Sequence, residues 1–149
     1  MILALGSDHG GFALKQEIKK HLDARGVSYK DFGCYSTDSI DYPMLAAEVA
    51  KSVASGEYAR GLLFCGTGIG ISIAANKVKG IRAACCSDYF SAKYTRLHND
   101  ANILCVGGRV VGVGLAIELV DIFLDTEFEG GERHQRRVDM IAQIETQGQ

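Results

Sequence analysis

The chain has 149 residues, of which 47% are hydrophobic and only one is proline, so we expect one folded domain with its own core rather than a disordered segment. The formal net charge of −2, without aromatic residues interleaved among basic ones, excludes an electrostatic footprint for nucleic acid. No apolar run approaches the ~20 residues that cross a bilayer, and the first residues lack the charged region of a signal peptide, so we expect a cytosolic protein without a membrane span.

Five cysteines occur without any C-x-x-C pair. An odd set with this spacing fits neither a disulfide framework nor a zinc site, so we expect reduced thiols. The cysteines are Cys34, Cys65, Cys85, Cys86 and Cys105.

The first predicted strand is the apolar run Ile2–Leu5, which ends in the polar, glycine-rich segment Gly6–Gly11. Apolar residues then recur every four positions from Leu14 to Leu22, which predicts an amphipathic helix. Asp8 and His9 therefore lie in the loop after a strand. Such a pair can orient a sugar hydroxyl, bind phosphate, ligate a metal or simply cap the loop, and the sequence leaves these alternatives open.

Val27–Phe32 partly alternates and predicts a second strand. Pro43 is typical of the first turn of a helix, and apolar residues at helical spacing continue from Ala46 to Val53. Tyr42 comes just before this helix, where it can line a ligand pocket or staple the helix entry.

The segment Gly61–Lys77 predicts a buried strand, a tight loop with glycine at every second position from Gly66 to Gly70, and the start of a helix. It has neither the dinucleotide-binding nor the Walker glycine pattern. Cys65 therefore lies at the carboxyl end of a strand, the edge at which open α/β sheets bind ligands. A helix N-terminus there lowers the pKa of a cysteine and favours the thiolate. The alternative is a buried structural cysteine beside a packing turn.

Ile81–Cys86 predicts a fourth strand, with Cys85 and Cys86 expected in the core, and a helix is predicted from Tyr89 to Leu97. The polar loop His98–Asp100 and a fifth strand at Asn102–Val106 follow. The next helix, Gly112–Asp125, is apolar over most of its surface, from which we expect a contact with a second subunit.

A last helix is predicted at about 133–145, followed by a frayed tail over 147–149. Arg133 and Arg137 lie one helical turn apart near its start, where they can bind a phosphate or form a solvated basic face. Five strands alternating with helices predict a single-domain, three-layer α/β/α fold over residues 1–149, with a five-stranded parallel, Rossmann-like sheet.

Four motifs together resemble ribose-5-phosphate isomerase type B, within a group that includes isomerases of allose 6-phosphate and galactose 6-phosphate: Ser7–Gly11, Cys65–Gly70, His98–Asn102 and Gly107–Arg109. The resemblance implies a cytosolic enzyme of the pentose phosphate pathway that interconverts ribose 5-phosphate and ribulose 5-phosphate without a metal or cofactor. It also implies a homodimer or a dimer of dimers.

The resemblance further implies roles for individual residues. Cys65 is the base, since no carboxylate occurs from Gly66 to Lys77, and His98 opens the sugar ring, with Thr67 as a third catalytic residue. The residues implied in substrate binding are Asp8, His9, Tyr42, Gly66, Gly68, Ile69, Gly70, Asn99, Arg109, Arg133 and Arg137.

The resemblance also implies that the site is shared, with Cys65 and its loop from one chain and His98, Asn99 and Arg109 from the other. The alternatives are an isomerase of a six-carbon phosphosugar, a non-catalytic phosphosugar sensor, and acyl transfer by Cys65 with His98.

Overall fold

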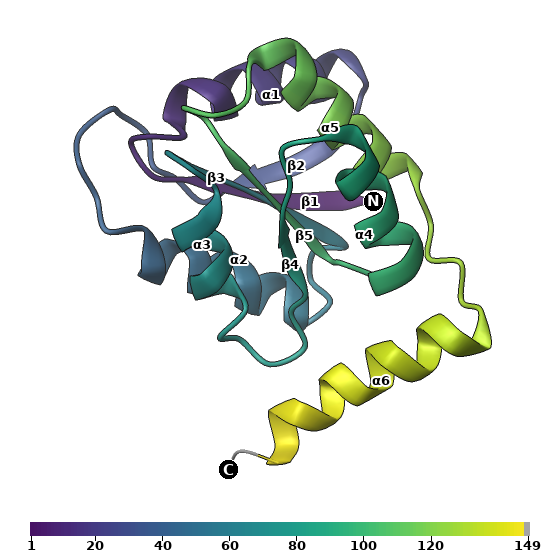
Figure 1. The fold of residues 1–149 in the computed structure, drawn as a ribbon. Coiled ribbons are helices and arrows are strands. Elements are labelled where there is room, and N and C mark those ends of the chain that lie inside the picture. The colour runs from purple at the N-terminus through teal and green to yellow at the C-terminus, as the bar shows by residue number, and fades with distance from the viewer. Residues whose placement is uncertain (148–149) are drawn as a thin grey trace.

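Five parallel strands form one sheet in the order β2-β1-β3-β5-β4, and helices cover both of its faces (Figure 1). The structure, a computed structural model, describes residues 1–147. The strands are β1 (Ile2–Ser7), β2 (Ser28–Asp31), β3 (Arg60–Cys65), β4 (Ala83–Cys85) and β5 (Ile103–Gly107). The helices are α1 (Phe12–Ala24), α2 (Tyr42–Ala54), α3 (Ile69–Ala75), α4 (Tyr89–Asn99), α5 (Val113–Asp125) and α6 (Glu132–Gln147). The predicted three-layer α/β/α fold is confirmed.

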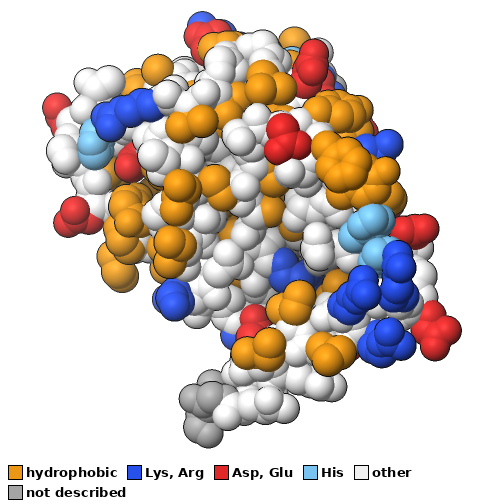
Figure 2. All heavy atoms as spheres, in the orientation of Figure 1, with side chains coloured by type: hydrophobic (Ala, Val, Ile, Leu, Met, Phe, Trp, Pro, Cys, Tyr) orange, Lys and Arg blue, Asp and Glu red, His pale blue; other side chains and the backbone are white. Residues whose placement is uncertain are grey.

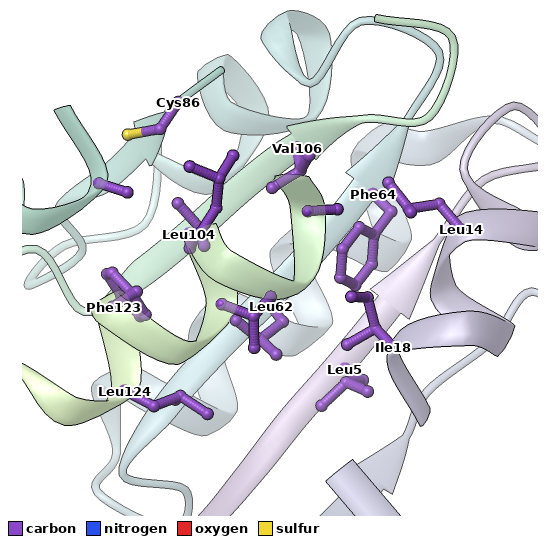
Figure 3. Packing of buried hydrophobic residues seen from close by; sticks show 14 of the residues in the cluster. Leu5, Leu14, Ile18, Leu62, Phe64, Cys86, Leu104, Val106, Phe123 and Leu124 are labelled. Atoms are coloured by element: carbon purple, nitrogen blue, oxygen red, sulfur yellow. The ribbon is translucent and has the colours of Figure 1, made fainter. Parts of the chain in front are cut away.

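The sheet separates two apolar cores, because successive side chains of a strand point to opposite faces. On one face, Leu62 and Phe64 of β3 pack with residues of α1, α4 and α5 (Figure 3). On the other face, Leu63 packs with Val49 of α2 and Ile71 of α3. All five side chains are fully buried. A central strand covered on both faces has to be apolar throughout, which explains why Gly61–Cys65 reads as one continuous apolar run.

Most of the apolar surface of α5 is covered within the chain. The apolar character of this helix is therefore not by itself evidence for a contact with a second subunit. The helix packs beside both α1 and α4, and Leu119, Val120 and Phe123 are fully buried. Exposed apolar side chains remain in its first turns, at Val113 and Leu115.

β4 is shorter than the predicted strand 81–86, because the N–H of Arg82 donates to the side chain of Asn102, at 2.8 Å, instead of joining the sheet ladder. Cys86 is buried as expected. Cys85 is exposed, so the prediction that it lies in the core was wrong. The reason is that β4 is an edge strand whose carboxyl end opens toward the glycine loop: the Cys85 Sγ lies 3.7 Å from the carbonyl oxygen of Thr67.

α6 extends from the body of the domain and packs against α4 (Figure 1). Its buried side chains, His134 and Val138, lie on the side that faces α4. Met140 and Ile144 are exposed further along the helix. The predicted frayed tail begins at Gln147, which ends α6, and its residues 148–149 lie outside the described residues. No helix within residues 1–147 has the length and hydrophobicity of a membrane-spanning segment.

Two glycines let the loops at the carboxyl edge of the sheet pack backbone against backbone. A Cβ at Gly11 would lie 2.6 Å from the amide nitrogen of Cys65, and one at Gly107 would lie 2.6 Å from the carbonyl carbon of Thr67. Real Cβ atoms do not approach backbone this closely. Only glycine therefore allows the three loops to close around the end of β3.

We expect Gly11→Ala to lower the free energy of unfolding by about 3 kcal/mol, because the new methyl group pushes β3 away from the loop. For a domain of this size the loss corresponds to a fall in Tm of roughly 6–12 °C, measured by calorimetry.

Gly114→Ala is the matched control, because a Cβ at this position in α5 meets nothing within 4 Å and alanine favours the helix. Equal Tm values for the two variants would contradict the close-packing interpretation.

Candidate active site

The carboxyl ends of β1 and β3 border the place where the chain connections diverge to opposite faces of the sheet. α1, which follows β1, packs in one core, and α3, which follows β3, packs in the other. Such a switch point is where open α/β sheets bind ligands. Asp8 follows β1 and Cys65 ends β3, and the N–H of Asp8 donates to the carbonyl oxygen of Phe64 at 3.1 Å. The structure therefore brings Asp8 and Cys65 to the same edge.

Cys65 is held by backbone N–H groups at its sulfur and at its carbonyl oxygen. Its residue is 4% exposed, and the N–H of Gly68 donates to its Sγ at 3.1 Å. The N–H of Gly108 donates to the Cys65 carbonyl at 2.8 Å. Gly68 caps α3 with a φ of 78°, a conformation that favours glycine. An N–H donor at the sulfur and a helix start beside it both stabilise negative charge, which suits a cysteine that acts as a base.

The rest of the glycine loop opens to solvent. Thr67 is exposed, and its hydroxyl accepts a hydrogen bond from the N–H of Ile69 at 3.3 Å. A Cβ at Gly70 would come within 2.6 Å of the Tyr42 ring, so the Tyr42 hydroxyl end lies against this loop. Tyr42 is the first residue of α2, and it therefore borders the loop as well as the helix entry.

Arg109 lies beside this loop within the same chain. Its N–H donates to the Gly66 carbonyl at 3.0 Å, and its guanidinium Nη1 lies 3.4 Å from the position that a Cβ of Gly66 would take. The expectation that Arg109 joins the site from the opposite chain, together with His98, is thus corrected. We use the name loop cluster for Asp8, His9, Tyr42, Cys65–Gly70 and Arg109.

Asp8 and His9 are oriented by backbone groups. One carboxylate oxygen of Asp8, Oδ1, accepts hydrogen bonds from the N–H groups of Gly10 at 2.8 Å and Gly11 at 3.0 Å, so the loop-capping alternative is part of its role. His9 Nδ1 accepts a hydrogen bond from the N–H of Ile40 at 3.3 Å. This bond leaves the proton of the neutral ring on Nε2, which can donate to an anion or a hydroxyl.

A buried lysine holds the segment that contacts His9. Lys15 of α1 is fully buried, and its Nζ donates to Asp31 Oδ1 at 2.7 Å and to the Cys34 carbonyl at 2.6 Å. Burial lowers the pKa of Lys15, and the hydrogen bond to Asp31 acts in the opposite direction. Lys15 thereby fastens the end of β2 and the start of the segment that leads to Ile40.

His98 and Asn99 lie at the opposite edge of the sheet from Cys65. They end α4, which starts after the carboxyl end of β4 and runs back to the amino end of that strand. The Asn99 carbonyl accepts a hydrogen bond from Nε of Arg82, the residue just before β4, at 3.2 Å. At 1.5 Å per residue, the helix carries His98 about 14 Å from Tyr89. One chain alone does not bring His98 to its own Cys65.

Arg133 and Arg137 lie on α6, next to the end of α4 and away from the loop cluster. Arg133 Nη2 is 3.5 Å from Nε2 of His134, and the His134 ring stacks on His98. Figure 2 shows pale-blue histidine side chains beside a group of blue basic side chains at the right of the view. We use the name α4–α6 cluster for His98, Asn99, Arg133, His134 and Arg137.

The sequence analysis missed His134, and it also missed Glu129, whose carboxylate lies near Nε2 of both histidines. Glu129 Oε2 is 3.8 Å from His98 Nε2 and 3.7 Å from His134 Nε2. The position of His134 within the arginine-rich start of α6 was the one available signal. Nothing in the sequence indicates that α6 docks on the end of α4.

Cys85 is the other thiol near the site. It is exposed, and desolvation followed by the negative charge of Cys65 raises its pKa above the ordinary value. Cys85 is therefore a weaker candidate for a thiolate base than Cys65, although it lies closer to solvent.

Known proteins of one family match nearly the whole chain. A family model described as Ribose/Galactose Isomerase matches residues 3–141. Ribose-5-phosphate isomerase B of Escherichia coli (strain K12) is 54% identical over 143 residues, which are 96% of this chain and 95% of that protein.

Solved structures of ribose-5-phosphate isomerases have the same fold as this chain. Ribose-5-phosphate isomerase B from Clostridium thermocellum has a TM-score of 0.97 at 52% identity, with 100% of both chains covered. Ribose-5-phosphate isomerase B from Mycoplasma genitalium, solved with bound ribulose-5-phosphate, has a TM-score of 0.92 at 41% identity over 97% of this chain and 96% of that one. The family resemblance predicted from the sequence is confirmed: the chain belongs to the ribose/galactose isomerase family and is an isomerase.

Proposed function

We propose that this isomerase interconverts ribose 5-phosphate and ribulose 5-phosphate, with Cys65 as the base. The observation that carries the proposal is the Cys65 thiol, buried at the carboxyl edge of the sheet with the N–H of Gly68 3.1 Å from its sulfur. The bound ribulose-5-phosphate in the Mycoplasma genitalium relative supports the substrate. Incubation with ribose 5-phosphate, followed by detection of ribulose 5-phosphate, tests the function directly.

The chemical step moves one proton from C2 of the open-chain aldose to C1. The Cys65 thiolate takes the C2 proton, the released electron pair forms a C1–C2 double bond, and the carbonyl electrons move to O1. The thiol then returns the proton to C1 as O2 becomes the carbonyl oxygen. The proton of O2 passes to O1, a transfer that we assign to the exposed Thr67 hydroxyl.

Charge on O1 of the enediolate exists only after the C2 proton has left. N–H groups of the Gly66–Gly70 loop and of the first turn of α3 therefore stabilise this intermediate more than the neutral sugar. His9 and Arg109 hold the substrate from the neighbouring loops, and the phosphate contacts position the reacting carbons.

We infer a homodimer in which the loop cluster of one subunit meets the α4–α6 cluster of the other. The two clusters lie at opposite edges of one sheet, so a second copy is needed to unite Cys65 with His98. Exposed apolar residues support such a contact: Ile69, Phe90 and Val110 follow β3, β4 and β5, and they are 56%, 67% and 61% exposed. An exposed apolar edge of this kind is typical of an interaction surface.

We also propose a cytosolic location, because all five cysteines lie within residues 1–147 and are free thiols, as is usual in a reducing compartment. A six-carbon phosphosugar is the second candidate substrate, because the matching family includes galactose as well as ribose isomerases. Comparison of kcat/KM for ribose 5-phosphate, allose 6-phosphate and galactose 6-phosphate decides between them.

We expect Cys65→Ala to lower kcat by at least about 10³-fold while the Kd for ribose 5-phosphate changes little, because the base acts in the chemical step and the phosphate contacts remain. Turnover and calorimetric binding measure the two effects.

Cys85→Ala is the matched control for Cys65→Ala. Its thiol lies beside the same loop, but its raised pKa leaves it unsuited to act as a base, so we expect most activity to remain. Loss of activity in Cys85→Ala together with full activity in Cys65→Ala would reverse the assignment.

Arg137→Gln should weaken ribose 5-phosphate binding about tenfold to 150-fold, the equivalent of about 1.5–3 kcal/mol for a charge-assisted hydrogen bond, with little effect on unphosphorylated ribose. Arg136→Gln removes the neighbouring charge of α6 and serves as the control. Equal losses for both sugars, or for both variants, would argue against a specific phosphate contact by Arg137.

Inactive Cys65→Ala and His98→Asn dimers should complement each other when they are dissociated together and reassociated. Random pairing makes half of the dimers hybrids, and each hybrid has one intact site of two, so about a quarter of wild-type activity should return. Native mass spectrometry confirms that hybrids have formed. Hybrids without activity would show that the site is not shared, and the isomerase assignment would stand.

A further inference from the structure

The ring of His98 is held between two other aromatic rings. Tyr94, one helical turn earlier in α4, meets His98 edge to face with ring centroids 4.8 Å apart. On its other side, the His134 ring of α6 stacks on His98 with centroids 4.1 Å apart and an angle of 8° between the planes. His134 is 8% exposed. The imidazole of His98 is thus fixed in position although it lies near the surface.

Glu129 brings a carboxylate to this pair. Its Oε2 lies 3.8 Å from His98 Nε2 and 3.7 Å from His134 Nε2, which are ion-pair distances for a protonated ring. The backbone N–H of Glu129 donates to the Leu97 carbonyl at 3.1 Å, which anchors the segment between α5 and α6 beside the residue that precedes His98. The backbone and the side chain of Glu129 therefore both contact the carboxyl end of α4.

The arrangement does not suit a metal ion, although the three possible ligand atoms lie within 4.8 Å of one another. A metal binds in the plane of each imidazole, and two nearly parallel, stacked rings share no common plane. The Arg133 guanidinium, 3.5 Å from His134 Nε2, also opposes a second cation. The cluster is suited to hold one mobile proton.

We propose that Glu129 and His134 are positioning residues for His98 in the opening of the sugar ring, an inference that rests on the proposed function. Ring opening moves one proton from O1 to O4. The C1–O4 bond breaks and its electron pair stays on O4, while the electrons of the O1–H bond form the second bond of the C1 carbonyl. His98 gives a proton to O4 and regains one from O1.

Glu129 balances the charge on His98 while the ring is protonated. Desolvation, and then the positive charges of His98 and Arg133, lower the pKa of His134, which disfavours a second positive charge in the stack. His98 is the ring of the pair that is open to solvent, since its side chain is 34% exposed and that of His134 is 10% exposed.

The test measures ring opening without isomerisation. In the Cys65→Ala background the base is absent, and exchange between the two furanose anomers of ribose 5-phosphate, followed by NMR magnetisation transfer, reports opening and closing alone. We expect Cys65→Ala to accelerate this exchange. Adding Glu129→Gln should reduce the acceleration by up to about fivefold, the effect of losing one partly exposed ion pair.

Controls separate positioning from folding. Cys65→Ala/Glu132→Gln removes a nearby exposed carboxylate and should keep the acceleration, and the Kd for ribose 5-phosphate should be the same in all three proteins. Cys65→Ala/His134→Phe, which keeps a flat ring on His98, should retain more acceleration than Cys65→Ala/His134→Ala.

Three results would overturn the proposal: no acceleration by Cys65→Ala, equal acceleration with Glu129→Gln and Glu132→Gln, or a loss in Glu129→Gln that parallels a loss of binding. Conversion of ribose 5-phosphate by the unmodified enzyme tests the proposed function separately.

Discussion

The candidate site depends on the close approach of three backbone segments at the end of β3. The loop after β1 contacts Phe64 and Cys65 through Gly11, and the loop after β5 contacts Thr67 through Gly107. Hydrogen bonds from Gly108 and Arg109 to the carbonyls of Cys65 and Gly66 close the arrangement. The sulfur of Cys65 therefore occupies a position set by backbone atoms, which move less than side chains. A catalytic base needs this kind of support, since a displacement of about 1 Å is costly to the reaction.

The α4–α6 cluster is held together by side-chain contacts rather than by backbone contacts. His98 is fixed by ring stacking with Tyr94 and His134, and by the carboxylate of Glu129, at the place where α6 meets α4. α6 packs against α4 with only His134 and Val138 buried, and none of its residues belongs to the apolar cluster between the sheet and α1, α4 and α5. The basic side chains of this half are therefore carried on a helix outside that core. The chain thus places the proposed base on the sheet and the proposed ring-opening histidine on a peripheral helix pair.

The strands and helices could be predicted from the sequence because each has a strong local signal. The apolar run Gly61–Cys65 and the helical spacing from Leu14 to Leu22 are properties of neighbouring residues, and the loops between them carry glycine. The position of Cys65 at the carboxyl edge followed from that order alone. The family resemblance supplied the roles of His98 and the arginines, and the comparisons confirm the family.

Features set by tertiary packing could not be predicted. Cys85 is exposed because β4 is an edge strand, and the strand order is not encoded in the alternation of one strand. Arg109 joins Cys65 in its own chain because the loop after β5 folds over Gly66. The stacking of His134 on His98 joins residues 36 positions apart, through a helix whose docking has no sequence signal.

In the proposed homodimer, the separation of the two halves of the site along α4 also makes activity depend on enzyme concentration. An active centre assembled from two subunits exists only in proportion to the associated species, so mass action governs the number of working sites. Specific activity would then fall on dilution even though every chain stays folded. The cellular abundance of the protein, as well as the level of its substrate, would set the flux through the reaction.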